Sequence, residues 1–284
     1  MKKNILAASG LLICGAVLIY SCQKEKTITP AGNPSGHTFA LREGAPDPWR
    51  SGDMHNNTMT YVLNQVDGVP FASHEDANAA ATLHIGNYFA ANYAAYEMHQ
   101  ANINGGIMFK DEHINSATFP AINYVALAQD QLAPLQSSGQ ITPVESQIIM
   151  NLFNAIEAAR FNGSGAAGVE LALQEARQQW ESQHFNVDEQ EGFLSAAVIS
   201  VGNGSVAFWQ TQVNVMDPPG GPGAEMIPFW VGCDVVGALA GGGSSMYSQR
   251  NNASYDWYEI GGQAVIWGAS SSLLGSSRFR AFFD

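Results

Sequence analysis

The residues best placed to do acid–base chemistry are His55, Asn56 and Asp234, which lie far apart in the sequence. His55 falls on one helical stripe with four apolar residues, Met59, Val62, Leu63 and Val66. Asp234 stands in an apolar run between Cys233 and Val235, so we expect its carboxylate to be buried and to need a partner. The sequence therefore predicts that His55 and Asp234 pair across a core, with side chains within ~6 Å.

This pair has two interpretations. In the first, His55 is a structural core histidine whose ring nitrogens are hydrogen-bonded. In the second, it is the base of a hydrolase-type site with Asn56 and Asp234, where Asn56 projects about 100° around the helix toward another element. We favour the structural interpretation, because no acidic or cysteine residue nearby in the sequence is placed to pair with His55; Asp53, two residues earlier, falls on another face of the helix.

Other candidates for chemistry are weaker. Cys233 is expected to act as a small packing residue instead of a nucleophile, since it falls in a series of small residues. His84 and His99 lie on one helix stripe but ~22 Å apart at the rise of an α-helix, too far to share a metal ion. No two histidines have the spacing of a helical zinc site, so we predict neither metal nor cofactor.

The N-terminus carries the strongest signal. Lys2 and Lys3 precede an apolar stretch of signal-peptide length, shorter than the ~20 residues of a membrane span. The tetrad Ile19-Tyr20-Ser21-Cys22 resembles the lipobox of bacterial lipoproteins, and this resemblance implies cleavage before Cys22 and its acylation, for example with palmitate. The segment 23–26, Gln-Lys-Glu-Lys, resembles the short charged signal of surface-displayed Bacteroidota lipoproteins. The expected partner of Cys22 is thus the lipid bilayer of the outer membrane.

Composition narrows the class of protein further. The chain has 12 basic and 25 acidic residues, and without Lys2 and Lys3 the balance is 10 to 25, a formal charge of −15. Such a charge repels nucleic acid, so we exclude nucleic-acid binding. With 46% hydrophobic residues the chain can bury a substantial core. After Cys22 only Cys233 remains, which leaves no intramolecular disulfide.

Periodicity predicts an all-α multi-helix bundle with a helical hairpin at its C-terminal end. We divide the chain into a signal peptide (1–21), a Pro- and Gly-containing tether (22–48), a domain of about six helices (49–216) and a Gly-rich segment (217–284). Asp53 is predicted to cap the first helix. Ser73 begins a long second helix, which ends at 104–106, Asn-Gly-Gly.

The later helices have less uniform signals. Thr118 and Pro120 are predicted to begin a helix that fades after Pro134. The clearest start is 142–145, Thr-Pro-Val-Glu, for a helix ending at Gly163. Further helices are predicted over about 166–185 and from 188 to 212, the last interrupted near 202–204, Gly-Asn-Gly.

Small residues recur at every fourth position in two stretches near the C-terminus. They are Cys233, Gly237, Gly241 and Ser245, and then Ala264, Gly268, Ser272 and Ser276. This spacing lets two helices approach backbone to backbone, so we predict a tightly packed hairpin over 225–277 with 247–258 as its connector. Insertion of the hairpin into a membrane is the alternative. We disfavour it because the apolar stretches are short and Asp234 interrupts the first.

Two short segments resemble a group of Bacteroidota lipoproteins and secreted proteins with no assigned activity. They are 52–56, Gly-x-x-His-Asn, and 234–238, Asp-Val-Val-Gly-Ala. The resemblance implies an all-helical fold and brings no activity. We thus expect a membrane-anchored lipoprotein that acts as a binding or structural module for an unidentified protein or small molecule. The alternatives are a hydrolase-type enzyme using His55, Asn56 and Asp234, and a membrane-active protein using the hairpin.

Overall fold

A computed structural model describes residues 46–66, 69–114, 122–186, 191–216, 226–252 and 254–272. In these ranges the chain forms nine α-helices, two short 3₁₀ helices and no strand, which confirms the predicted all-α fold. The predicted signal peptide, Cys22 and nearly all of the tether lie outside the described residues. The described residues, which begin at Pro46, belong to one compact unit.

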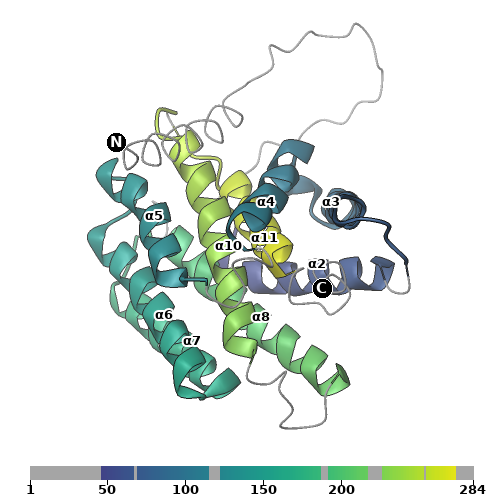
Figure 1. The fold of residues 1–284 in the computed structure, drawn as a ribbon. Coiled ribbons are helices and arrows are strands. Elements are labelled where there is room, and N and C mark those ends of the chain that lie inside the picture. The colour runs from purple at the N-terminus through teal and green to yellow at the C-terminus, as the bar shows by residue number, and fades with distance from the viewer. Residues whose placement is uncertain are drawn as a thin grey trace, which may run out of the picture. The chain divides into compact units, whose positions relative to one another are not determined.

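The helices are η1 (Pro48–Arg50), α2 (Ser51–Val66), α3 (His74–Asn92), η2 (Ala94–Tyr96), α4 (Gln100–His113), α5 (Tyr124–Ser137), α6 (Pro143–Asn162), α7 (Gly165–Ser182), α8 (Phe193–Met216), α10 (Ile227–Ser248) and α11 (Trp257–Ser272). In Figure 1, α10 runs through the middle of the unit, with α5, α6 and α7 on one side and α2, α3, α4 and α11 on the other. Helix α8 packs against both α10 and α2. The C-terminal hairpin thus forms the centre of the unit.

The start of α2 differs from the prediction. Asp53 does not cap the helix, because α2 begins at Ser51 and Asp53 lies in its first turn. Asp47 is instead the N-cap of η1, the short helix just before α2, and its side chain accepts a hydrogen bond from Trp49 N (3.0 Å). The predicted apolar face of α2 is confirmed, since His55 and the four apolar residues of its stripe are all buried.

The junction of η1 and α2 is fixed to α8 by the hydroxyl of Ser200. Ser200 Oγ donates to the carbonyl of Trp49 (2.7 Å) and accepts from Gly52 N (2.9 Å). The Trp49 ring meets Trp180 edge to face at 5.1 Å, and the Arg177 guanidinium lies 4.8 Å from its centre. The point where the described chain begins is therefore clamped between α7 and α8.

The long helix predicted from Ser73 is two helices. Ser73 does cap α3, accepting from Asp76 N at 3.1 Å, but α3 ends at Asn92, and α4 follows after η2. Residues 104–106, predicted to end a helix, lie inside α4. The reason is packing: β-carbons on Gly105 and Gly106 would lie 2.7 and 3.0 Å from atoms of Trp267 in α11, so the glycines permit close approach instead of ending the helix.

The interruption predicted at 202–204 is also wrong, because α8 runs unbroken through it. A β-carbon on Gly204 would lie 2.5 Å from the carbonyl oxygen of Gly52, so the glycine is needed where α8 crosses α2. The predicted helix starts at Thr118 and at 188 lie outside the described residues. Asn123 caps α5, and its side chain accepts from Ala126 N at 2.9 Å.

The start signal at Thr142 is confirmed. Its hydroxyl accepts from Glu145 N (3.0 Å), Pro143 is the first residue of α6, and Gly163 ends the helix with a φ of 73°. The carboxylate of Glu145, however, crosses to the first turn of α8. There it accepts from Ser195 N (3.0 Å) and Ser195 Oγ (3.1 Å), so a residue of α6 caps α8.

The predicted hairpin is α10 and α11, and the residues of both helices are almost entirely buried. Glycines at the crossing permit the contact: a β-carbon on Gly241 would lie 2.7 Å from the Trp267 ring. In the described part of the chain, no helix is both long enough and apolar enough to cross a membrane.

Candidate functional site

The helices α2 and α10 bring His55 and Asp234 together in the centre of the unit. His55 Nε2 lies 3.6 Å from Asp234 Oδ2, and both side chains are 0% exposed. The sequence-based prediction of this pair is confirmed. Helices α8 and α11 complete the surroundings, contributing Ser205, Trp209 and Ser272.

The two carboxyl oxygens of Asp234 differ in their hydrogen bonding. Its Oδ2 accepts from Ser205 Oγ (2.5 Å) and Trp209 Nε1 (3.0 Å), whereas Oδ1 has no hydrogen-bond partner among the described residues. Burial raises the pKa of Asp234, because it disfavours the charged carboxylate more than His55 and the hydroxyl and indole donors favour it. The carboxyl group of Asp234 is therefore easier to protonate than that of a solvent-exposed aspartate.

The two ring nitrogens of His55 have separate partners. Nδ1 lies 3.1 Å from Asn56 Oδ1, and Nε2 lies 3.1 Å from Ser272 Oγ. Asn56 thus contacts the histidine beside it, whereas we expected it to reach another element. With Nδ1 protonated, the ring donates to Asn56 and its Nε2 can accept the Ser272 proton, the order of a nucleophile, a base and an orienting group.

This geometry differs from a Ser-His-Asp triad in one respect. In such a triad the carboxylate binds Nδ1 and the hydroxyl binds Nε2. Here Asp234 and Ser272 both approach Nε2, and the orienting group at Nδ1 is a neutral amide. Asp234 therefore competes with Ser272 for the same edge of the imidazole.

The cluster is sealed by close helix packing. Gly268 of α11 passes over it, and a β-carbon there would lie 3.1 Å from the carbonyl oxygen of Asp234 and 3.5 Å from the imidazole. His55, Asp234, Ser205 and Trp209 are all 0% exposed, and Ser272 is 1% exposed. In this conformation these five side chains offer a substrate almost no exposed surface, and only Asn56 beside them is partly exposed.

Cys233 is also a core residue, as the sequence predicts. It is buried, with its Sγ 3.7 Å from the hydroxyl of Tyr124. Burial raises the pKa of the Cys233 thiol, and the neighbouring Asp234 raises it further. A thiol that resists ionisation is a poor nucleophile, so Cys233 serves packing.

A second polar cluster joins α3 to α4. Lys110 is 1% exposed, and its Nζ donates to Asn78 Oδ1 (2.6 Å) and lies 3.0 Å from Asp111 Oδ1. His74 Nε2 lies 3.0 Å from the same Asp111 oxygen. Burial lowers the pKa of Lys110, which Asp111 partly offsets. This cluster was not predicted from the sequence, although Lys110 directly follows the apolar run Ile107-Met108-Phe109, which could have indicated that the lysine is buried.

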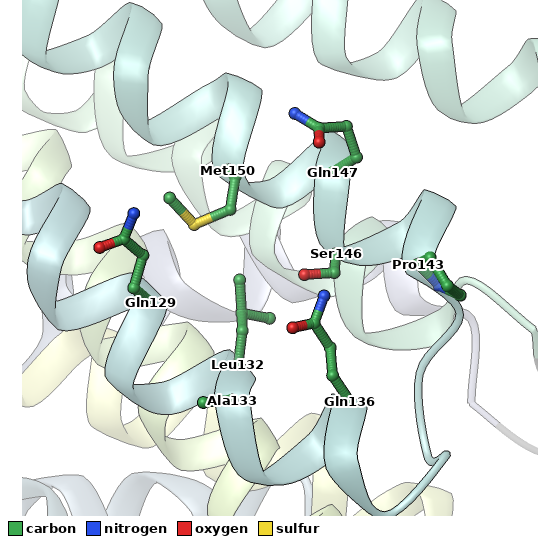
Figure 2. Close-up of a pocket in the computed structure, with 8 residues that line it drawn as sticks. All are labelled: Gln129, Leu132, Ala133, Gln136, Pro143, Ser146, Gln147 and Met150. Carbon is green, nitrogen blue, oxygen red and sulfur yellow. The ribbon is translucent and has the colours of Figure 1, made fainter.

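A groove of about 330 Å³ lies between α5 and α6, and Figure 2 shows it. Leu132 and Gln136 of α5 point across it toward Ser146 and Met150 of α6. Gln129 and Gln147 also line the groove. In the described ranges, no three His, Cys, Asp or Glu side chains group closely enough to hold a metal ion.

Sequence reasoning identified three members of the central cluster, His55, Asn56 and Asp234, and missed Ser205, Trp209 and Ser272. Ser205 and Trp209 are four residues apart on α8, one helical turn, and both face Asp234. That spacing was visible in the sequence, but nothing in it indicated which element they face. No protein-family model, curated protein or solved structure matches this chain.

Proposed function

We propose that this chain is a bacterial outer-membrane lipoprotein whose helical body is a non-catalytic binding or structural module at the cell surface. The observation that carries the proposal is the burial of His55 and Asp234, both 0% exposed. The acid–base pair at the centre of the molecule packs against helices on all sides and meets no solvent. It therefore serves to link α2, which packs on α8 and α11, to α10 through the core, which is a structural role.

The anchor is supported by the sequence alone. The lipobox-like tetrad ends at Cys22, and the tether after it is followed by a folded unit that begins at residue 46. An acylated Cys22 would carry more than one chain, which is sufficient for stable attachment to a bilayer. The segment 23–26 supports display on the outer face.

Mass spectrometry of the full chain purified from a bacterial membrane tests the anchor. We expect a protein that begins at Cys22 and carries diacylglyceryl and acyl groups, and a Cys22→Ser variant that is neither cleaved there nor acylated. Shaving intact cells with a protease tests the display. A protein that retains an unmodified Met1, or one that the protease does not reach, would overturn the corresponding part of the proposal.

A hydrolase is a second candidate, favoured by the order Ser272–His55–Asn56. The two distances of 3.1 Å lie within the range for a nucleophile, its base and an orienting group. The test is labelling with a fluorophosphonate probe, compared between the wild type and Ser272→Ala. If the probe labels the wild type and Ser272→Ala abolishes the labelling, the hydrolase proposal replaces the proposal of a non-catalytic module. If saturating probe does not label the wild type, the hydrolase proposal is rejected.

The membrane-active alternative has less support. Its mechanism needs apolar hairpin faces that can meet lipid, whereas the described residues of α10 and α11 are almost entirely buried by other helices. Dye release from phospholipid vesicles tests it, and we expect no release above that of an unrelated lipoprotein.

A further inference from the structure

We propose that Lys110 and Asn78 join in an isopeptide bond, which forms within the folded chain without an enzyme and links α4 to α3 covalently. The lysine amine attacks the side-chain amide of the asparagine, and ammonia is lost. The observations that carry the proposal are the mutual contacts of Lys110, Asn78 and Asp111 in the polar cluster between the two helices. The proposal is independent of the membrane anchor and of the role of His55.

The attacking nitrogen already touches the amide. Lys110 Nζ lies 2.6 Å from Asn78 Oδ1, closer than it lies to Asp111 Oδ1 at 3.0 Å. A C=O bond is about 1.2 Å long, so Nζ lies at most about 3.8 Å from the carbonyl carbon Cγ. The torsion that turns an asparagine amide is broad, so a rotation can present the face of this carbon to Nζ. Groups held this close react as if at a very high concentration.

The carboxyl group of Asp111 reaches both nitrogens that must exchange protons. Its Oδ1 lies 3.0 Å from Lys110 Nζ, and its Oδ2 accepts from Asn78 Nδ2 at 2.9 Å. One group can therefore take a proton from the attacking nitrogen and give a proton to the leaving nitrogen. These are the general-base and general-acid tasks that the exchange of one amide for another requires.

The reaction balances without any further reactant. Lys110, as an ammonium, gives one proton to Asp111, and its neutral Nζ attacks Asn78 Cγ to form the new N–C bond. Asp111 returns that proton to Nδ2, the Cγ–Nδ2 bond breaks, and ammonia leaves. Nζ gives its second proton to the departing ammonia, which enters water as ammonium. The new amide keeps one N–H, and no atom is oxidised or reduced.

The surroundings of the lysine favour both the attack and the product. Lys110 is 1% exposed and lies on one buried helical stripe with Ile103, Ile107 and Ile114. Burial lowers the pKa of Lys110 more than Asp111 raises it, so the neutral amine is more populated than in an exposed lysine. The product is a neutral amide, which removes the cost of keeping an ammonium group in the core.

An ion pair with Asp111 does not by itself account for this arrangement. The Asp111 side chain is 39% exposed, so a lysine at an exposed position could pair with it while remaining in water. Lys110 is buried instead, and the shorter of its two contacts is with a neutral amide. The arrangement thus places an amine against an amide carbon, with a carboxyl group beside both.

The scarcity of lysine gives a direct test. After Cys22 the sequence has three lysines, Lys24, Lys26 and Lys110. Lysyl endopeptidase cuts after a lysine whose side-chain amine is free, so a cross-linked Lys110 resists it even in a denatured chain. The full chain, purified from membranes, is denatured in urea, digested with this enzyme and analysed by mass spectrometry.

We expect the wild type to give one large fragment, 27–284, that is lighter than its sequence mass by about 17 Da, the mass of ammonia. Asn78→Ala removes the carbon that is attacked, and Asp111→Asn removes the proton carrier. Each variant should instead give two fragments, 27–110 and 111–284. The matched control is Asn87→Ala, an exposed asparagine of α3, which should keep the single lighter fragment.

Two fragments from the wild type would overturn the proposal, as would a single fragment of full sequence mass. A succinimide at an asparagine also loses ammonia, but it leaves Lys110 cleavable, so it falls among the overturning outcomes. Tandem mass spectrometry after a second digestion must find a branched peptide joining Asn78 to Lys110, and a branch between other residues would contradict the assignment. A single lighter fragment from Asp111→Asn would refute the role of Asp111. The wild type alone decides whether the bond exists, so the test holds even if a variant does not fold.

Discussion

Glu145 should make this protein more stable in mild acid than at neutral pH. Its carboxylate is buried while it caps α8 from α6 through Ser195. Burial, with a smaller contribution from the nearby Glu191, outweighs the hydrogen bonds from Ser195 and raises the pKa of Glu145 from 4.5 to about 7. The perturbation that isolates this effect is Glu145→Gln, since the amide oxygen can still accept from Ser195 N but cannot ionise.

The sign follows from proton binding in the two states. Because the folded pKa exceeds the unfolded one, the folded state holds more protons between pH 4.5 and 7, and stability falls as pH rises through that window. A shift of about 2.5 units corresponds to about 3 kcal/mol at 1.36 kcal/mol per unit. The free energy of unfolding of Glu145→Gln, minus that of the wild type, should therefore increase by about 3 kcal/mol from pH 4.5 to pH 8.

Urea unfolding followed by circular dichroism at constant ionic strength measures this difference across the pH range. Taking variant minus wild type removes the contributions of all other titrating groups, including the buried Asp234, whose pKa is also raised. The control is Glu175→Gln on α7, where the carboxylate is exposed and the difference should stay flat. A Glu145→Gln difference that is equally flat, or that decreases with pH, would refute the assignment of Glu145 as a buried cap with a raised pKa.

Three further predictions concern the rest of the body. His55→Ala should destabilise the fold by about 3–5 kcal/mol because it leaves the buried carboxyl group of Asp234 without its histidine partner, and adding Asp234→Asn should recover part of that loss; urea unfolding of the double-mutant cycle checks this, and strictly additive effects would contradict it. Gly52→Ala should lower the melting temperature far more than Gly243→Ala, since a β-carbon at Gly52 overlaps backbone of α8 and one at Gly243 meets only a leucine methyl at 3.2 Å; similar melting temperatures would argue against the close crossing. Lysyl endopeptidase, which cuts only after lysine, should cut first in the predicted tether, because the single lysine in the described ranges, Lys110, is buried; mass spectrometry of the digest identifies the fragments, and early cleavage at Lys110 would contradict its burial.

The fold class and the central pair were both predictable from the sequence. The stripe containing His55 and the charged residue within an apolar run at Asp234 each predict burial, and a buried carboxylate needs a partner. Spacing of small residues likewise predicts the contact between α10 and α11. These predictions succeed because each depends on one periodic pattern and one physical requirement.

The predicted helix boundaries were wrong at glycines, because a glycine can either end a helix or allow another helix to approach closely. Gly105 and Gly204 resemble helix ends in sequence, but each allows a second helix to approach closely. Which role applies depends on the partner, Trp267 in one case and Gly52 in the other, and neither is near in sequence. Ser205 was missed for the same reason. It faces Asp234 only because of the way α8 and α10 cross, and spacing along the sequence does not show that crossing.

The Ser200 clamp has a mechanical consequence if the chain is tethered to a membrane through Cys22, as we propose. Any drag on the body then reaches Trp49, which lies in η1 just before α2 begins at Ser51. Two sets of contacts lie on that path: the two hydrogen bonds of Ser200, and the contacts of Trp49 with Trp180 and Arg177. Because several contacts share the load, α2 is not unfolded one turn at a time. These contacts of Ser200 and Trp49 would then lie at the point where the tether applies its force.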